Sequence, residues 1–184
     1  MCLANTAYFG LAPLGILTTL VGKERMPPQF TDVPEMSLWS QSIGGLIINF
    51  GIAEFLTLQC VEKCCGPQAA IDIKKKKLSE RIAAAEAALS ASRLSLKEKN
   101  RAHELWSEVS VLSQIRNRIA HNPIFMGFSA SQNRRVFSII DLKKMVPVGE
   151  NALEPLDHSE IAATALRVRD IAQELSSLIE AVPV

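Results

Sequence analysis

Apolar residues recur along most of this chain at the spacing of amphipathic helices. The pattern predicts four long helices, over residues 35–65, 74–95, 97–121 and 157–182. The first is apolar on nearly all sides, which is typical of the central element of a core or of a dimer interface. The last carries apolar residues at alternating spacings of four and three, as in a helix-bundle seam: Ile161, Ala165, Val168, Ala172, Leu175, Ile179 and Val182. The sequence therefore predicts an all-α, up-down four-helix bundle.

Helical periodicity fails between Pro123 and Pro155. Residues 136–140 and 145–148 are short apolar runs that suggest the two strands of a hairpin. An insertion of this length is either disordered or functional. We therefore expect a small β-hairpin or a loop between the third and fourth helices.

An apolar segment precedes the predicted bundle. Residues 1–22 carry no charge and approach the length that spans a bilayer, whereas a proline-rich linker follows and ends at residue 33. Lys23 and Arg25 come after the apolar run, which argues against a signal peptide, and polar residues, glycines and Pro13 interrupt it. We expect this segment to dock on the bundle or on a partner. A membrane anchor remains the alternative, and residues 34–184 are predicted to form the helical domain.

The net charge and the cysteine spacing argue against several classes of protein, including general polyanion binders and zinc proteins. The formal net charge is +1, so bulk electrostatics cannot make the chain a general polyanion binder, and any RNA contact must be local. Cys2, Cys60, Cys64 and Cys65 suit neither a disulfide framework nor a zinc site, so we expect inert, buried thiols in a reduced, cytoplasmic setting. Neither a phosphate-cradling glycine motif nor a serine or cysteine nucleophile motif occurs, and no cofactor is expected.

Arg116 conflicts with the apolar pattern of the third predicted helix. Projected at ~100° per residue, Leu105, Val109, Leu112 and Ile119 form one stripe, and Arg116 falls near its centre. Removing an unpaired ion from water costs on the order of several kcal/mol. Arg116 is therefore expected to meet a carboxylate or to line a polar seam, and such a seam would be a functional site.

Glu54 is the matching conflict in the first predicted helix. It is the only charged residue between Glu35 and Glu62, so it needs a partner, and Arg116 is the obvious candidate. Two interpretations stay open. The pair either fixes how the two helices meet, or it makes Glu54 the supporting residue that orients a catalytic arginine.

Asn117 and His121 complete the constellation. They are spaced i to i+4 and share a helix face, where the amide can hold the imidazole. Arg116 and His121 diverge by ~140° on a straight helix. Pro123 disfavours helical geometry at Asn122, so the helix is expected to end at His121. The two side chains converge if the helix ends or distorts there, or if a partner chain supplies half of the site.

At these residues the chain resembles the HEPN family, the higher eukaryotes and prokaryotes nucleotide-binding domains. Its ribonuclease members carry an arginine, a polar residue, three further positions and a histidine, here Arg116, Asn117 and His121. The resemblance covers residues 34–182. It implies a helical bundle, a homodimer and metal-independent RNA cleavage at a composite site between subunits. It also implies a possible toxin or defence role, with an antitoxin or a nucleotidyltransferase as partner, and a smaller branch of binding-only members.

Each motif residue suits one chemical role. Histidine takes or gives a proton near neutral pH, and arginine stabilises charge on phosphate oxygens. Asn117 would orient His121 or hold the substrate. Three hypotheses follow: a HEPN-type endoribonuclease that attacks phosphate with the ribose 2′-hydroxyl, a non-catalytic module that binds RNA, a nucleotide or a protein, and a membrane-associated scaffold.

Other basic residues have less specific signals. Arg118, Arg134 and Arg135 lie close in sequence to the motif and are candidates for RNA phosphate contact, although a merely solvated loop would carry the same charges. Four lysines at residues 74–77 are expected to open the second helix as a solvated cluster, with RNA contact as the alternative. His103 lies about five helical turns from His121 and is expected at the surface.

Overall fold

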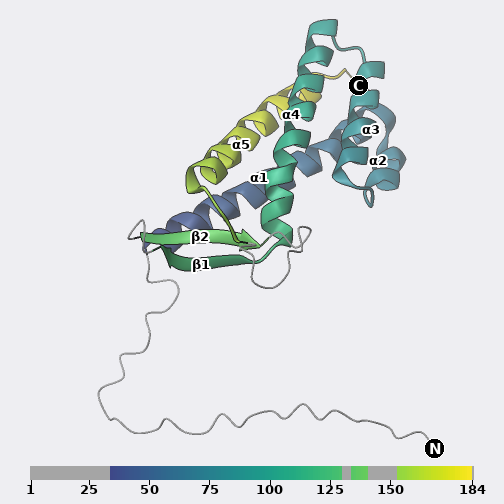
Figure 1. Cartoon of the computed structure of the whole chain (residues 1–184). Helices are drawn as coiled ribbons and strands as arrows, with labels where there is room; N and C mark the ends of the chain where they lie inside the picture. The colour runs from purple at the N-terminus through teal and green to yellow at the C-terminus, as the bar shows by residue number, and fades with distance from the viewer. Residues whose placement is uncertain (1–33, 130–133, 141–152, 184) are drawn as a thin grey trace, which may run out of the picture.

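The computed structural model describes residues 34–129, 134–140 and 153–183. Over these residues the chain is mostly helical and carries a small antiparallel sheet (Figure 1). The helices are α1 (Pro34–Cys65), α2 (Pro67–Ile73), α3 (Leu78–Ala91), α4 (Leu96–His121) and α5 (His158–Glu180), and the strands are β1 (Ile124–Ser129), β2 (Arg134–Ile140) and β3 (Leu153–Pro155). The predicted helical class and the predicted place of the β insertion are confirmed. Residues 1–33, which include Cys2 and the predicted docking segment, lie outside the described residues.

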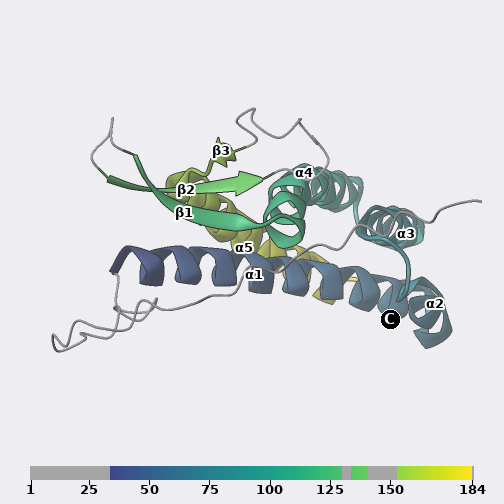
Figure 2. The same ribbon diagram turned by 60° about the horizontal axis from the view of Figure 1, so that its bottom comes forward.

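α1 is the long element on which the other described elements pack. Its buried face carries Leu46, Phe50 and Ala53, and α5 packs along it with every residue of the predicted seam buried. The Asn49 Nδ2 donates a hydrogen bond to the Ala165 carbonyl at 2.7 Å. Figure 2 shows α3, α4 and the sheet on one side of α1, and α5 crossing behind it. The opposite side of α1 is left uncovered by the described elements.

α1 also has the length and composition of a membrane-spanning helix. The most apolar 18-residue window of the described segment Met36–Cys65 has a mean hydropathy of 1.5, and a third of that window is buried against the rest of the chain. Core helices of soluble proteins pass the same test. The observation therefore carries little weight by itself.

The chain between α1 and α3 departs from the prediction. Gly66 has φ +91°, a left-handed conformation that glycine adopts without steric cost, and Pro67 begins a separate short helix, α2. The prediction that the four lysines open a long second helix is wrong. They follow α2 and form the turn before α3, with Lys77 in extended geometry as the N-cap residue.

α4 follows its predicted course from end to end. Ser95 accepts a hydrogen bond from the Glu98 amide, and the Glu98 carboxylate accepts one from the Ser95 amide, which is a capping box. Leu105, Val109 and Ile119 are buried, as the stripe predicts. Asn122 has φ −125° and ψ 145°, so the helix ends at His121, before Pro123.

The three-stranded sheet lies between α4 and α5 in the chain. β2 is the central strand, and it pairs antiparallel with β1 along its length and with β3 at its end. The predicted pairing of residues 136–140 with 145–148 is wrong, because β1 and β3 are the partners of β2; residues 145–148 lie outside the described residues. Phe137 of β2 stacks on Trp39 of α1 with ring centroids 4.3 Å apart, which anchors the sheet to the longest helix.

Candidate functional site

The two misfit charges of the sequence meet where α1, α3 and α4 come together. The Arg116 Nη2 of α4 donates to the Glu54 Oε1 of α1 at 2.6 Å, which confirms the predicted contact. The Arg81 Nη2 of α3 donates to the other oxygen, Oε2, at 2.7 Å. Glu54 therefore bridges two arginines from two different helices.

This triad is partly withdrawn from water. The side chains of Glu54, Arg81 and Arg116 are 20%, 13% and 26% exposed. Arginine stays protonated in proteins, so two positive charges share one carboxylate, and the triad keeps a surplus positive charge. Arg116 also keeps exposed area that an anion can reach. The arrangement can therefore bind an anionic group beside a fixed guanidinium.

Asn117 holds the same arginine from its other side. Arg116 Nη1 donates to the Asn117 Oδ1 at 2.9 Å, so one terminal nitrogen is fixed by Glu54 and the other by Asn117. The sequence predicts that Asn117 steadies His121, whereas in the structure its amide oxygen contacts Arg116. The guanidinium plane is thus set by two neighbours before any ligand arrives.

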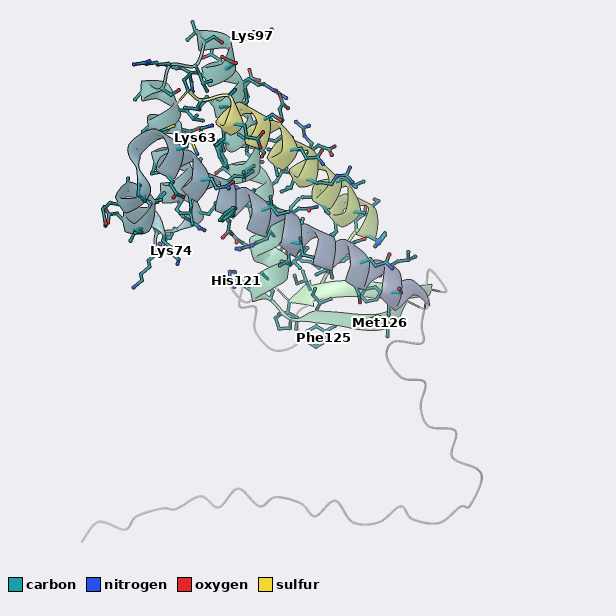
Figure 3. All side chains as sticks on the ribbon, turned by 180° about the vertical axis from the view of Figure 1, so that it is seen from behind. Lys63, Lys74, Lys97, His121, Phe125 and Met126 are labelled. Carbon is teal, nitrogen blue, oxygen red and sulfur yellow. The ribbon has the colours of Figure 1, made fainter. Side chains whose placement is uncertain are left out.

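His121 is the last residue of α4, and it is exposed. In the part of the chain that the structure describes, its imidazole makes no hydrogen bond or ion pair. Figure 3 shows it at the end of α4 beside α1, on the same flank as Phe125. Five residues along a helix amount to ~7.5 Å of rise, so a single chain holds Arg116 and His121 near each other without joining them.

The other candidate RNA-contacting arginines lie on α4 and on β2. Arg118 Nη2 donates to the Glu154 Oε2 at 2.6 Å, which ties α4 to β3. The Arg118 carbonyl accepts a hydrogen bond from the side-chain Nδ2 of Asn122 at 2.8 Å. Arg134 and Arg135 lie on β2, opposite β1, and their side chains lie outside the described part of the structure. Contact between these arginines and RNA stays a prediction.

The cysteines divide by burial. Cys60 is buried, its Sγ donates to the Ala85 carbonyl at 3.6 Å, and burial raises the pKa of its thiol, which keeps it unreactive. Burial also raises the pKa of Cys64. Cys65 is exposed, so the expectation of a buried thiol is wrong there, because Cys65 sits at the last turn of α1 beyond the packed surface. Nor do the cysteines join a metal site: over the described residues, no three or more side chains of histidine, cysteine, aspartate or glutamate are placed to hold a metal ion.

His103 is at the surface, as predicted. Its side chain is 71% exposed, and its Nδ1 lies 2.8 Å from the Glu86 Oε1 of α3. This histidine is on the same helix as His121 but away from the arginine pair, so it serves as a matched control for experiments on His121.

The sequence did not single out Arg81. Its helix carries other polar residues at this end, and an arginine one turn from a lysine run has the pattern of an ordinary surface cation. Glu54 could have indicated a second cationic partner, because a carboxylate has two oxygens and each can accept a hydrogen bond from a different side chain.

Comparison of the chain with protein-family models, curated protein sequences and solved structures finds no match. A fixed, partly exposed guanidinium and an exposed imidazole on the same helix have the chemistry to stabilise negative charge and to move a proton.

Proposed function

We propose that this chain is a metal-independent endoribonuclease of the HEPN type. The observation that carries the proposal is the fork of Arg116, fixed by Glu54 and Asn117 on the helix that ends at His121. An arginine held on two sides is suited to meet phosphate oxygens in one orientation.

The arrangement of helices supports the same family. In this proposal α1, α3, α4 and α5 correspond to the four helices of a HEPN-like up-down bundle, and the sheet between α4 and α5 and the short α2 are additions to it. In this proposal the HEPN-like bundle covers residues 34–184, and α4 is its motif helix.

The proposed reaction is transfer of a phosphodiester bond within RNA. The ribose 2′-oxygen bonds to the adjacent phosphorus, and the bond from phosphorus to the 5′-oxygen breaks, which leaves a 2′,3′-cyclic phosphate and a 5′-hydroxyl. A His121 imidazole accepts the 2′-hydroxyl proton, and a second imidazole returns a proton to the leaving 5′-oxygen. Arg116 stabilises the charge that develops on the phosphate oxygens.

The second imidazole comes from a second copy of the chain. The uncovered side of α1 exposes large apolar side chains, Leu38, Ile48, Ile52 and Phe55, at 46% to 64% of their area. Added side-chain atoms at Gly44 or Gly51 would meet nothing, so a second helix can approach α1 closely there. We propose that two chains pair through this face and bring both motifs to one cleft. RNA in the cytoplasm is the proposed substrate, and an antitoxin or a nucleotidyltransferase the proposed regulator.

A binding-only module is the second candidate. Two observations on the motif favour it. Arg116 is already paired with Glu54, and among the described residues no side chain binds the His121 imidazole and orients it. Such a protein would bind RNA or a nucleotide and leave it intact.

Product chemistry separates the two candidates. We would incubate the full chain with RNA of defined sequence in excess chelator and identify the new ends, with His121→Ala as the test variant and His103→Ala as its control. The proposal predicts 2′,3′-cyclic phosphate ends that vanish with His121→Ala and persist with His103→Ala. Intact RNA that is bound by the unmodified chain would instead establish the binding module.

A further inference from the structure

The lysine turn, residues 74–77, is the most concentrated positive surface of the described chain. All four side chains are exposed, and none forms an ion pair with a described residue. Like charges held close together repel each other, and an anion bound across them relieves that repulsion. The turn links α2 to α3, so its backbone is fixed at both ends by helices.

The lysine turn is connected directly to the candidate site. The Arg81 amide donates to the Lys77 carbonyl at 3.0 Å, which places Arg81 one helical turn after the lysines. Arg81 then shares Glu54 with Arg116. The lysines of the turn are thus followed in sequence by Arg81, which is joined through Glu54 to the arginine of the motif.

The carboxylates in this region leave the positive charge in excess. Asp72 accepts a hydrogen bond from the Gln68 amide of α2, Glu80 is exposed on α3, and Glu54 is shared by the two arginines. The positively charged side chains here are the four lysines, Arg81 and Arg116, so they outnumber these three carboxylates. In a chain with a net charge of +1, this flank is therefore a local basic surface, which the net charge conceals.

An aromatic side chain lies at the other end of the path. Phe125 of β1 is 46% exposed and follows His121 by four residues. Figure 3 shows Lys74, His121 and Phe125 on one flank of α1. Exposed aromatic rings near a basic path are the usual platforms for stacking unpaired bases.

We infer that the lysine turn forms a binding track for the phosphate backbone of single-stranded RNA, which leads past Arg81 to Arg116 and ends with a base stacked on Phe125. The inference rests on the proposed function, whose substrate it specifies. Lysines act here as point charges on phosphates and carry no sequence preference. The track binds the RNA on one side of the bond to be cleaved, and Phe125 binds it on the other.

Binding is measured without cleavage by using the His121→Ala chain as the background. Fluorescently labelled single-stranded RNA is titrated in excess chelator at several salt concentrations. The test variant adds Lys75→Ala and Lys76→Ala, and the control adds Arg93→Ala and Lys97→Ala, which remove the same charge from exposed residues near the α3–α4 junction. Figure 3 shows Lys97 at a different end of the molecule from Lys74. A third variant adds Phe125→Ala.

The track predicts that losing two lysines weakens binding about tenfold and lowers the salt slope by about 1.4, because each single-strand phosphate contact contributes about 0.7. Phe125→Ala should weaken binding by about fivefold or more and leave the slope unchanged, since stacking does not release counterions. The control variant should match the background chain in both quantities.

Equal affinity and slope in the lysine variant and its control would overturn the track. So would lysine-dependent binding to phosphatidylserine vesicles by a chain that does not bind the RNA. A different result would contradict the nuclease proposal alone. In that case the unmodified chain does not cleave RNA in excess chelator, but RNA binding still depends on the lysines.

Discussion

The Glu54 Oε1 lies 2.6 Å from the Arg116 Nη2, and this contact joins the longest helix of the chain to the helix that carries the motif. Each residue is a charge at a position where its own helix pattern calls for an apolar side chain. Their pairing satisfies both helices at once. It also fixes a guanidinium whose side chain stays 26% exposed, which is the basis of the nuclease proposal.

Glu54→Gln tests the support that this carboxylate gives to Arg116. The amide cannot neutralise the two arginines, so two partly buried cations lose their counter-charge, and we expect a loss of about 2 kcal/mol in the free energy of unfolding. Cleavage should fall at least tenfold because Arg116 is no longer held in one orientation. Urea unfolding and a cleavage time course measure the two effects.

Glu62→Gln is the control on the same helix. Glu62 is exposed, so its replacement should change the unfolding free energy by less than about 0.5 kcal/mol. If Glu54→Gln behaves like Glu62→Gln in both assays, Glu54 does not support the arginine.

Ile48→Asp tests the proposed dimer face of α1. Ile48 is 64% exposed, so the substitution should leave the folded chain intact, whereas a charge at the centre of an apolar interface should convert dimers to monomers. Mass measured by light scattering during size-exclusion chromatography reports the change. Leu166→Asp on α5, where the leucine is 52% exposed, is the control and should stay dimeric. A dimer that survives Ile48→Asp would place the interface elsewhere.

The α4–α5 contact should give the chain part of its acid sensitivity. Arg167 donates two hydrogen bonds of 2.6 Å to Glu108, and these hold the pKa of the Glu108 carboxyl below its ordinary value. A lowered carboxyl pKa stabilises the fold above the ordinary value, and this stabilisation is lost as the pH falls through the lowered value. The side chains are 42% and 37% exposed, so we expect only about 0.5 kcal/mol at neutral pH.

Glu108→Gln provides the measurement. The variant should be less stable than the unmodified chain at neutral pH, and the two should converge in urea unfolding as the pH falls through the lowered pKa of Glu108. A stability difference that is the same at every pH would show that the bonds to Arg167 do not depend on the charge of Glu108.

The long helices and the contact between Glu54 and Arg116 could be predicted from the sequence, and particular residues show why. The period of apolar positions in α4 and α5 is long enough to fix their faces, and Glu54 and Arg116 each break a pattern that is otherwise clear. α2 has only seven residues, too few for a periodic signal. β1 was missed because Gly127 interrupts its short alternation, and Arg81 because nothing in its own helix marks it as unusual.

The most direct test of the central claim is the rate of RNA cleavage by Arg116→Ala in excess chelator, compared with the unmodified chain at equal dimer content. Removing a fixed charge that stabilises the transition state should lower the rate at least about a hundredfold, whereas RNA affinity should fall far less. Cleavage at the unmodified rate would contradict the account, and Arg116 would then be a structural ion paired with Glu54.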